Sequence, residues 1–352
     1  MTSQQTIPNL TIGLDLGDRV SQTCEIDAAG RVVKRAAVAT TPGAIERYFG
    51  GRPPCRVALE VSTHSPWVSR QLKAMGHETV VSNTSKVYVK PRRKRRNDRI
   101  DAEFLARQAR SDVELLHPIE HRSAKAQEDL SLLRARDQLV QARTKLINHV
   151  RGAVKSTGAR ISKCSAEAFA RRAPEQVPEP LRLSLVPLLE VIADLTKRIR
   201  GMDDQVERMA EEHPEAVRLQ QPAGVGVLTA VAFVRAVEDP KRFKHSREVG
   251  AFFGLVPKLD DSSDSSPQLR ITKTGDPLVR RLLVSAARYI LGPFGPDCDL
   301  RRYGQAIAGR GGKNASKRAA VAVARKLAVM LHRLWVTGAD YDPEWVQHHR
   351  AA

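Results

Sequence analysis

The chain has 352 residues, of which 58 are Lys or Arg and 39 are Asp or Glu, so its formal net charge at pH 7 is +19. Hydrophobic residues make up 41% of it and no apolar run is long enough to cross a bilayer, which argues against a disordered chain and against an integral membrane protein. The N-terminus lacks a secretory pattern, so we expect a cytoplasmic protein. The four cysteines, Cys24, Cys55, Cys164 and Cys298, form no CxxC pair, so we expect neither a zinc site nor disulfides.

The first 115 residues predict an α/β domain. Three strands joined by tight turns come first, and helices and strands then alternate, which is the order typical of such domains. We expect strands at residues 10–17, 21–26, 31–38, 56–61 and 78–82, and helices at 44–49, 67–75 and 98–110.

A basic run lies between the last of these strands and the last helix. It places six cations in seven residues: Lys90, Arg92, Arg93, Lys94, Arg95 and Arg96. A solvated loop or a membrane-surface patch would also explain such a run, but it lacks the interleaved apolar residues of a membrane anchor. Because a surplus of positive charge is commonly balanced by a polyanion, we favour contact with nucleic acid phosphates.

The remaining chain predicts mostly helix. Residues 116–216 contain two long amphipathic helices, at about 123–156 and 181–212, which indicate an antiparallel coiled coil or a dimerisation element, unless they simply pack on the first domain. Residues 217–345 form a third region, mainly α-helical, with helices expected at 227–237, 278–291 and 316–336. We therefore expect three domains: 1–115, 116–216 and 217–345.

Four carboxylates are candidates for a metal site. Asp15 lies inside an apolar strand, Glu60 near the end of another strand, and Asp98 and Asp101 on one face at the start of a helix. Carboxylate oxygens are the ligands that Mg²⁺ prefers, and a buried carboxylate is costly unless a cation or a hydrogen-bond donor satisfies it.

Each carboxylate taken alone has a structural explanation. Asp15 would accept hydrogen bonds from the following turn, Glu60 would pair with Arg56, and the two helical acids would favour the helix dipole and pair with neighbouring arginines. Together, the order strand-Asp, strand-Glu, helix-Asp-x-x-Asp is typical of nucleases.

These elements resemble a known family. Gly13-Leu14-Asp15-Leu16-Gly17, Ala58-Leu59-Glu60 and Asn97-Asp98-Arg99-Ile100-Asp101-Ala102 are similar to the RuvC-like, RNase H-fold domain of the DEDD transposases of bacterial insertion sequences, with Arg96-Asn97 in place of the usual Lys-Thr. In the second half, three further segments are similar to fixed points of the same family: Pro222–Gly226, Gly254–Pro257 and Ile271–Asp276.

The resemblance implies a nucleophilic serine between the last two segments. Ser262 stands five residues after Pro257, at the family's serine position, but Ser263 replaces the glycine that usually follows, so either serine remains a candidate. A Ser/Asp-rich stretch is otherwise a surface loop. Lys273, Arg280 and Arg281 flank this stretch and would bind the DNA backbone, or would be solvated charges on a helix.

The family further implies a DNA transposase with Mg²⁺, or Mn²⁺ as a substitute, bound by Asp15, Glu60, Asp98 and Asp101. It also implies donor and target DNA, a structured bridge RNA and a homo-oligomer of two or four copies, with the acids of one subunit and the serine of another forming a composite site. Three alternatives stay open: a Holliday-junction-type metal nuclease without serine chemistry, a sugar kinase or actin-like ATPase, whose first phosphate loop Gly13–Gly17 also resembles, and a non-enzymatic nucleic-acid binder.

Overall fold

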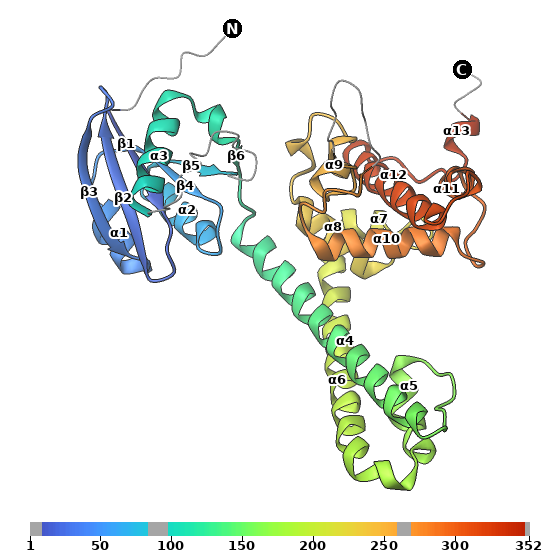
Figure 1. Ribbon diagram of the computed structural model, residues 1–352. Coiled ribbons are helices and arrows are strands. Elements are labelled where there is room, and N and C mark those ends of the chain that lie inside the picture. The colour runs from blue at the N-terminus through green and yellow to red at the C-terminus, as the bar shows by residue number, and fades with distance from the viewer. Residues whose placement is uncertain (1–8, 84–97, 259–268, 349–352) are drawn as a thin grey trace. The chain divides into compact units, whose positions relative to one another are not determined.

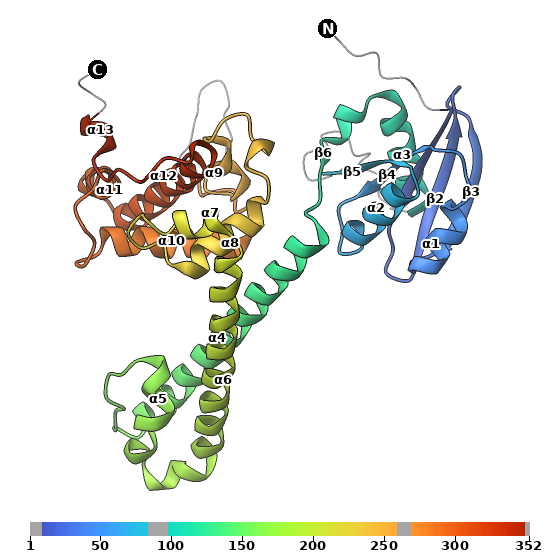
Figure 2. The same ribbon diagram turned by 180° about the vertical axis from the view of Figure 1, so that it is seen from behind.

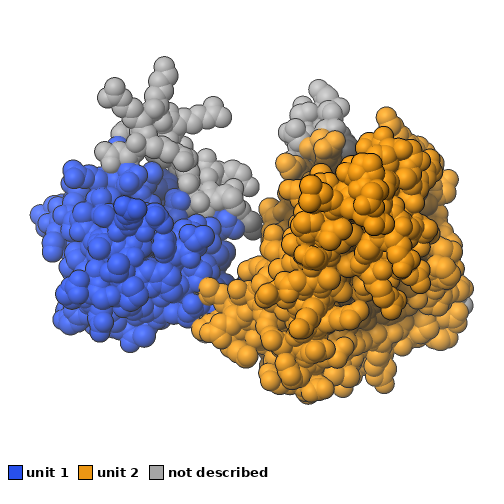
Figure 3. All heavy atoms as spheres, turned by 90° about the horizontal axis from the view of Figure 1, so that it is seen from below, with its two compact units in different colours: residues 1–122 blue, residues 123–352 orange. Residues whose placement is uncertain are grey.

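The computed structural model describes residues 9–83, 98–258 and 269–348. These residues belong to two compact units, 1–122 and 123–352, which Figure 3 distinguishes by colour. The division differs from the three predicted domains, because the long helices of the middle region share a hydrophobic core with the C-terminal helices. Within the described ranges, no helix is both long and apolar enough to cross a membrane.

The first unit is a mixed six-stranded sheet in the order β3-β2-β1-β4-β5-β6. The strands β1, β4 and β5 run parallel, and β2, β3 and β6 are each antiparallel to their neighbours. The strands are β1 (Leu10–Asp15), β2 (Val20–Asp27), β3 (Val32–Ala39), β4 (Arg56–Glu60), β5 (Glu78–Ser82) and β6 (Pro118–Ile119). The five strands expected from sequence are confirmed, and β6 is an addition.

Helices cover the two faces of this sheet (Figure 1). Ile12 and Leu14 of β1 point to the face that packs on α1 (Pro42–Phe49) and α2 (Ser65–Ala74). The alternate residues of the strands point to the other face, where Ala58 and Cys24 contact α3 (Asp98–Ser111). A short 3₁₀ helix, η1 (Val113–Leu116), follows α3 and leads to β6. The α/β character predicted for this part of the chain is confirmed.

The second unit begins with two long helices of 33 residues each, α4 (Ala124–Ser156) and α6 (Glu179–Glu211). They pack on each other, with α5 (Ala166–Arg172) and the 3₁₀ helix η2 (Pro174–Gln176) at the far end of the pair, as both ribbon views show (Figures 1 and 2). Both long helices were expected from sequence, within two residues of their observed ends.

The pair has an apolar cluster at each end, and the stretch between them combines polar contacts with the buried Ile199. Leu130 and Leu133 join the core of the C-terminal helices, whereas Ile147 and Val150 join the cluster around α5. Between these clusters, ion pairs and hydrogen bonds also join the two helices. Arg136 Nε lies 2.5 Å from Asp203 Oδ1, and Arg143 Nη1 lies 3.3 Å from Thr196 Oγ1.

The C-terminal helices surround α8, whose residues from Thr229 onward are all buried. An ion pair inside the packing, Arg235 Nε to Asp129 Oδ2 at 2.8 Å, joins α8 to α4. The elements here are α7 (Pro214–Arg218), α8 (Val227–Val237), η3 (Pro240–Arg242), α9 (Glu248–Phe252), α10 (Pro277–Leu291), α11 (Asp299–Gly309), α12 (Ala315–Thr337) and α13 (Trp345–His348). The mainly helical character predicted for this region is confirmed, and the four cysteines of the chain are free thiols.

Candidate active site

Asp15 and Glu60 end two neighbouring parallel strands. The register pairs Gly13 of β1 with Ala58 of β4 and Leu14 with Leu59, so one further step brings Asp15 level with Glu60. Side chains alternate along a strand, and Gly13 and Ala58 both face α3, so Asp15 and Glu60 also point to that face. Adjacent strands lie about 4.8 Å apart, which places the two half-buried carboxylates side by side.

The helix α3 brings the other two acids to the same edge of the sheet. Its Ala102 crosses β1 so closely that a Cβ on Gly13 would lie 1.9 Å from the Ala102 carbonyl oxygen. Further along, Ala109 O accepts a hydrogen bond from Arg56 Nη1, 2.9 Å away at the beginning of β4. The helix therefore runs opposite to the parallel strands, and its first turn, with Asp98 and Asp101, lies toward their carboxyl ends.

The lengths of the two elements agree with this alignment. From Ala109 back to Asp101 the helix rises by about 12 Å, and from Arg56 to Glu60 the strand advances by about 13 Å. Asp101 therefore lies toward the end of β4 that carries Glu60. The Gly at position 13 is needed for this close approach, because a larger side chain would push the helix that carries both acids away from the strand.

Several polar contacts fix α3 in place. The carboxylate of Glu103 accepts hydrogen bonds from Arg35 of β3 at 2.5 Å and from Arg107 at 2.8 Å. These two guanidinium groups hold the pKa of the Glu103 carboxyl below its usual range. Arg56 pairs with Glu78 at 2.9 Å. Arg56 thus has Glu78 and Ala109 as partners, and the pairing with Glu60 that we had considered is not among its described contacts.

The loops that follow β1 and β4 are also linked. His64 Nε2 lies 3.6 Å from Asp18 Oδ1, and the indole N–H of Trp67 donates to His64 Nδ1 at 3.2 Å. Because Nδ1 accepts this hydrogen bond, the proton of a neutral His64 is left on Nε2, facing Asp18. Neither His64 nor Asp18 is among the residues predicted from sequence; the signal that could identify them is that both closely follow the strands that carry the acids.

The side chains at this edge suit a hard divalent cation, because all four predicted metal ligands are carboxylates. The described side chains do not, however, form a cluster of three or more Asp, Glu, His or Cys residues able to share one ion. The backbone brings Asp15 and Glu60 together, and Asp98 is exposed. Mg²⁺ is commonly held by one or two carboxylates together with substrate phosphates, so this pair fits that pattern.

The predicted nucleophile, Ser262 or Ser263, lies outside the described residues, but the segments on either side of it contact each other. Pro257 pairs with Ile271 in an antiparallel bridge. Lys258 N donates to Arg270 O at 2.9 Å, and Thr272 N donates to Val256 O at 2.9 Å. The two segments flanking Ser262 therefore form the base of a hairpin.

Two glycines lock that base together. A Cβ on Gly254 would lie 2.3 Å from Thr274 O, and a Cβ on Gly275 would lie 1.9 Å from Phe252 O. Both glycines also have positive φ, +65° and +74°, which other residues rarely adopt. The two segments that resemble the family's fixed points therefore pack backbone against backbone. We use the name glycine clamp for Gly254, Gly275 and the two paired segments that they hold together.

The cations predicted to bind nucleic acid divide into three groups. The basic run 90–96 lies outside the described residues, and Lys273 is exposed beside the clamp. Arg280 Nη1 donates to the carbonyls of Phe253 (3.1 Å) and Thr274 (2.8 Å), and Arg281 pairs with Asp137 of α4. Arg280 therefore also braces the clamp, and contact of these residues with DNA stays a prediction.

The turn at Pro222–Gly226, one of the segments similar to fixed points of the family, packs against α10. Gly224 has φ +81°, and a Cβ there would lie 2.8 Å from Ala286 O. Gly226 caps the N-terminus of α8 and has open space around its Cα. Close packing against α10 therefore explains why a glycine stands at position 224. The same explanation does not apply to Gly226, because a Cβ there would have open space.

Two family models match the chain. One, described as a transposase, matches residues 12–158, and the other, described as the transposase IS116/IS110/IS902 family, matches residues 216–297. The first match contains all four predicted acids, and the second contains the glycine clamp and Ser262.

Curated relatives match over nearly the full length. A probable family 20 transposase of Pseudomonas aeruginosa is 30% identical over 94% of this chain and 98% of its own. The transposase for insertion sequence element IS1111A of Coxiella burnetii is also 30% identical, over 94% of this chain and 90% of its own. The transposase for insertion sequence element IS1328 of Yersinia enterocolitica is 29% identical over 92% of this chain and 96% of its own.

Proposed function

The chain belongs to the IS116/IS110/IS902 family of insertion-sequence transposases and is a DEDD transposase, and we propose that it breaks and rejoins DNA by attack of Ser262 on a phosphodiester with the assistance of Mg²⁺. The observation that carries this proposal is the alignment of Asp15 with Glu60 on the face covered by α3. We also assign the first unit to the RNase H-like (RuvC-like) fold, on the basis of its strand order and its antiparallel β2.

The proposed chemistry conserves the number of phosphoester bonds. A bond forms between Ser262 Oγ and phosphorus while the bond from phosphorus to one deoxyribose oxygen breaks, and the hydroxyl proton of the serine ends on the departing oxygen. The reverse reaction with a new DNA end rejoins the strand without an external energy source. A serine hydroxyl is a weak nucleophile unless it is activated, which is why the carboxylates matter.

In this proposal Asp15 and Glu60 would hold Mg²⁺, and Asp98 and Asp101 would add negative charge at the same edge of the sheet from the start of α3. When bound, the ion supplies positive charge that stabilises the charge developing on the phosphate and the departing oxygen. The aligned strands and the anchored helix fix the carboxylates before substrate arrives, so little reorganisation is needed during the reaction.

The proposed partners are donor and target DNA, a structured bridge RNA and further copies of the chain. Support for nucleic acid comes from the net charge of +19 and from the basic run at residues 90–96. The family resemblance adds the RNA and an assembly of two or four copies, in which the acids of one copy act with the serine of another.

Trapping of the covalent intermediate tests the serine. We expect Ser262→Ala to abolish both strand exchange and the protein–DNA adduct that denaturing electrophoresis of labelled DNA detects. Ser263→Ala, one residue away, is the matched control and should retain both. An adduct that survives in Ser262→Ala and disappears in Ser263→Ala would place the nucleophile at Ser263 and contradict the assignment.

Neutral substitutions test the acids. We expect Asp15→Asn, Glu60→Gln and Asp101→Asn each to lower recombination by about 100-fold or more while DNA binding is retained, because charge stabilisation contributes to chemistry rather than to docking. Glu46→Gln on α1, which makes the same charge change on the opposite face of the sheet, should have no effect. Undiminished recombination in the first three would refute the metal role, and metal-dependent cleavage without any adduct would favour the Holliday-junction-type nuclease instead.

A further inference from the structure

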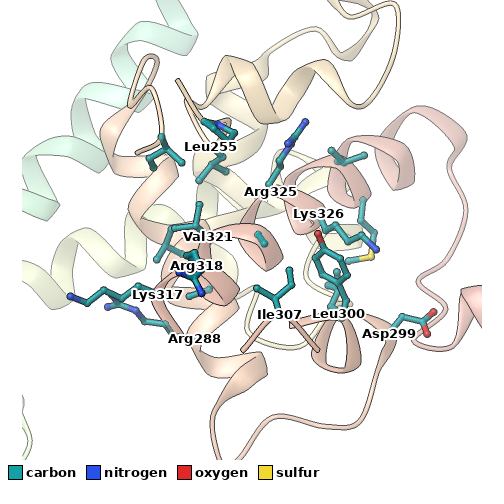
Figure 4. A pocket seen from close by; sticks show the side chains of 18 of the residues that line it. Leu255, Arg288, Asp299, Leu300, Ile307, Lys317, Arg318, Val321, Arg325 and Lys326 are labelled. Carbon is teal, nitrogen blue, oxygen red and sulfur yellow. The ribbon is translucent and has the colours of Figure 1, made fainter. Parts of the chain in front are cut away.

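A long groove crosses the C-terminal unit between α10, α11 and α12. Its volume is about 1520 Å³, and Pro257 and Ile271, at the base of the hairpin, line one end of it. Figure 4 shows Arg288, Lys317 and Arg318 gathered at one side of the groove and Arg325 and Lys326 further along it. The groove therefore begins beside Pro257 and Ile271, which flank the segment containing Ser262, and continues along a row of cations.

The charge of the lining is strongly unbalanced. Nine of the lining residues are Lys or Arg, and two are acidic, Asp299 and Asp342. Asp299 pairs with Arg302 at 3.1 Å, and Asp342 with His348 at 2.8 Å, so both acids already face a basic group of their own. The groove thus offers its positive charge to a ligand carrying several negative charges.

The cations on α12 are regularly spaced. Exposed basic residues occupy positions 317 and 318, 325 and 326, and 333, which are separated by about two helical turns, or about 11 Å. The turns between them present Val321, Val329 and Met330 to the groove. The opposite side of α12 is buried in the core, through residues such as Val323 and Leu327. One face of the helix therefore alternates cationic and apolar turns along the groove.

Aromatic rings extend this alternation. Lys326 Nζ lies 3.8 Å from the ring centroid of Tyr303 on α11, and the guanidinium carbon of Arg333 lies 4.2 Å from that of Trp345. Apolar and aromatic surface between cations suits unpaired bases, which stack on such side chains while their phosphates meet the positive charges. A duplex keeps its bases stacked inside and offers mainly phosphates, so it would leave the apolar floor unused.

We propose that this groove binds a single strand of DNA that leads away from the phosphodiester attacked by Ser262. The choice of DNA over RNA rests on the proposed function, because the groove begins beside the two residues, Pro257 and Ile271, between which lies the serine that would be joined to DNA. The requirement for an unpaired strand rests on the lining alone. Arg288, Lys317 and Arg325 would contact phosphates, and Tyr303 would contact a base.

Binding of the full-length protein to labelled oligonucleotides tests the groove. Without divalent ions, so that no chemistry occurs, fluorescence anisotropy compares an oligothymidylate of about 20 nucleotides with a duplex and an RNA strand of the same length. The variant Arg288→Gln/Lys317→Gln/Arg325→Gln removes three exposed cations for which no hydrogen bond or ion pair to the described residues is seen. We expect single-stranded DNA to bind about tenfold more weakly, and the slope of log K against log salt to decrease by about 2, for three lost phosphate contacts.

A matched variant separates the groove from general electrostatics. Lys145→Gln/Lys197→Gln/Arg200→Gln removes three exposed cations from α4 and α6 and should change the affinity less than about twofold. Equal losses in the two variants, or no loss in the groove variant, would overturn the proposal. An equal loss for the duplex would overturn the single strand, and tighter, groove-dependent binding of RNA would overturn the assignment to DNA.

A second variant tests base contact. Tyr303→Leu keeps the groove apolar and removes the aromatic ring, so we expect weaker binding of single-stranded DNA with an unchanged salt slope. Melting temperatures within about 2 °C of the parent would show that each variant is folded; unchanged binding in a folded Tyr303→Leu would refute the base contact. Failure of the proposed function would appear separately, as absence of the Ser262 adduct in the parent protein with its metal ion.

Discussion

Asp276 shows how one carboxylate supports the region next to the proposed nucleophile. It caps α10 by accepting from Leu278 N at 2.9 Å and Val279 N at 3.3 Å, and it pairs with Arg134 of α4 at 2.6 Å. Burial alone would raise the pKa of Asp276, but Arg134 and the two backbone N–H groups outweigh burial, and the pKa lies below its usual range. The residue directly follows Gly275 of the glycine clamp, so it joins the clamp to the long helices.

The lowered pKa of Asp276 predicts a pH-dependent contribution to stability. The charged form is favoured in the folded protein, so the contribution is fully present above the unfolded pKa of about 3.9 and is lost as the pH falls through the lower folded value. We expect Asp276→Asn, which keeps a capping oxygen, to lower the free energy of unfolding by about 1 kcal/mol at pH 7. The difference should shrink below about pH 4. Thermal melts of both proteins between neutral and acidic pH would check this, and a difference independent of pH would contradict it.

At the scale of residues, the sequence identified side chains whose chemistry is unusual for their position. It did not identify the residues that they contact. Asp15 could be recognised because a carboxylate within an apolar strand is costly. The choice of Glu78 rather than Glu60 as the partner of Arg56 depends on the register between β4 and β5, which no local pattern encodes. The contact between His64 and Asp18 likewise exists only because two parallel strands bring their following loops together.

At the scale of elements, the glycine clamp gives a physical reason for the glycines in the two short segments, around residues 254 and 275, that resemble fixed points of the family. The backbone approaches are too close for any side chain, and both glycines have positive φ. The clamp joins the two ends of the segment that contains Ser262, so its integrity sets where that segment leaves the core.

We therefore expect Gly275→Ala to impair the protein more than an ordinary surface substitution does. A Cβ 1.9 Å from Phe252 O forces the backbone apart, and the positive φ adds strain, together costing about 2–4 kcal/mol. Chemical denaturation would measure this loss. Gly309→Ala on α11, where nothing lies within 4 Å of the added Cβ, is the control and should be neutral or slightly stabilising. Equal stability of the two variants would show that the clamp does not depend on glycine.

Prediction of the elements succeeded where the local pattern was strong. Strands β1 to β5 and the long helices have apolar residues at the expected spacing, and they were found. Strand β6 has two residues and exists only through its pairing with β5. Helix α11 is not among the helices expected from sequence, and Leu291 and Val323 pack directly against its Gly304. Tertiary contacts therefore decide these elements.

At the scale of the whole molecule, the excess positive charge predicts how binding responds to salt. We expect the purified protein to carry RNA from the expression host, and its affinity for nucleic acid to fall by about tenfold or more between about 50 and 200 mM salt, because several phosphates are neutralised at once. Sequencing of the copurified RNA and titration at several salt concentrations would check both. A flat salt response would contradict the assignment of the basic run to phosphate contact, and a nucleic-acid-free preparation would count against the RNA partner.

Composition and resemblance predicted the two kinds of architecture, a mixed sheet first and helices afterwards, but not their boundaries. The middle region was expected as a domain of its own because its periodicity differs from that of its neighbours. In the folded chain Leu130 and Leu133 belong to the same core as α8 and α12. Such a shared core arises from side chains far apart in sequence, so a change in local pattern does not mark the edge of a compact unit.

Because the stretch midway along α4 and α6 belongs to neither apolar cluster, the length of the pair can be changed there. Seven residues inserted at matching positions of both helices would extend the pair by about 10 Å and rotate its end by only about 20°. Neither apolar cluster would need to be repacked, because each lies entirely to one side of the insertion. Natural variants or engineered chains can therefore alter the reach of this projection in steps of one heptad while keeping the folded ends that it connects.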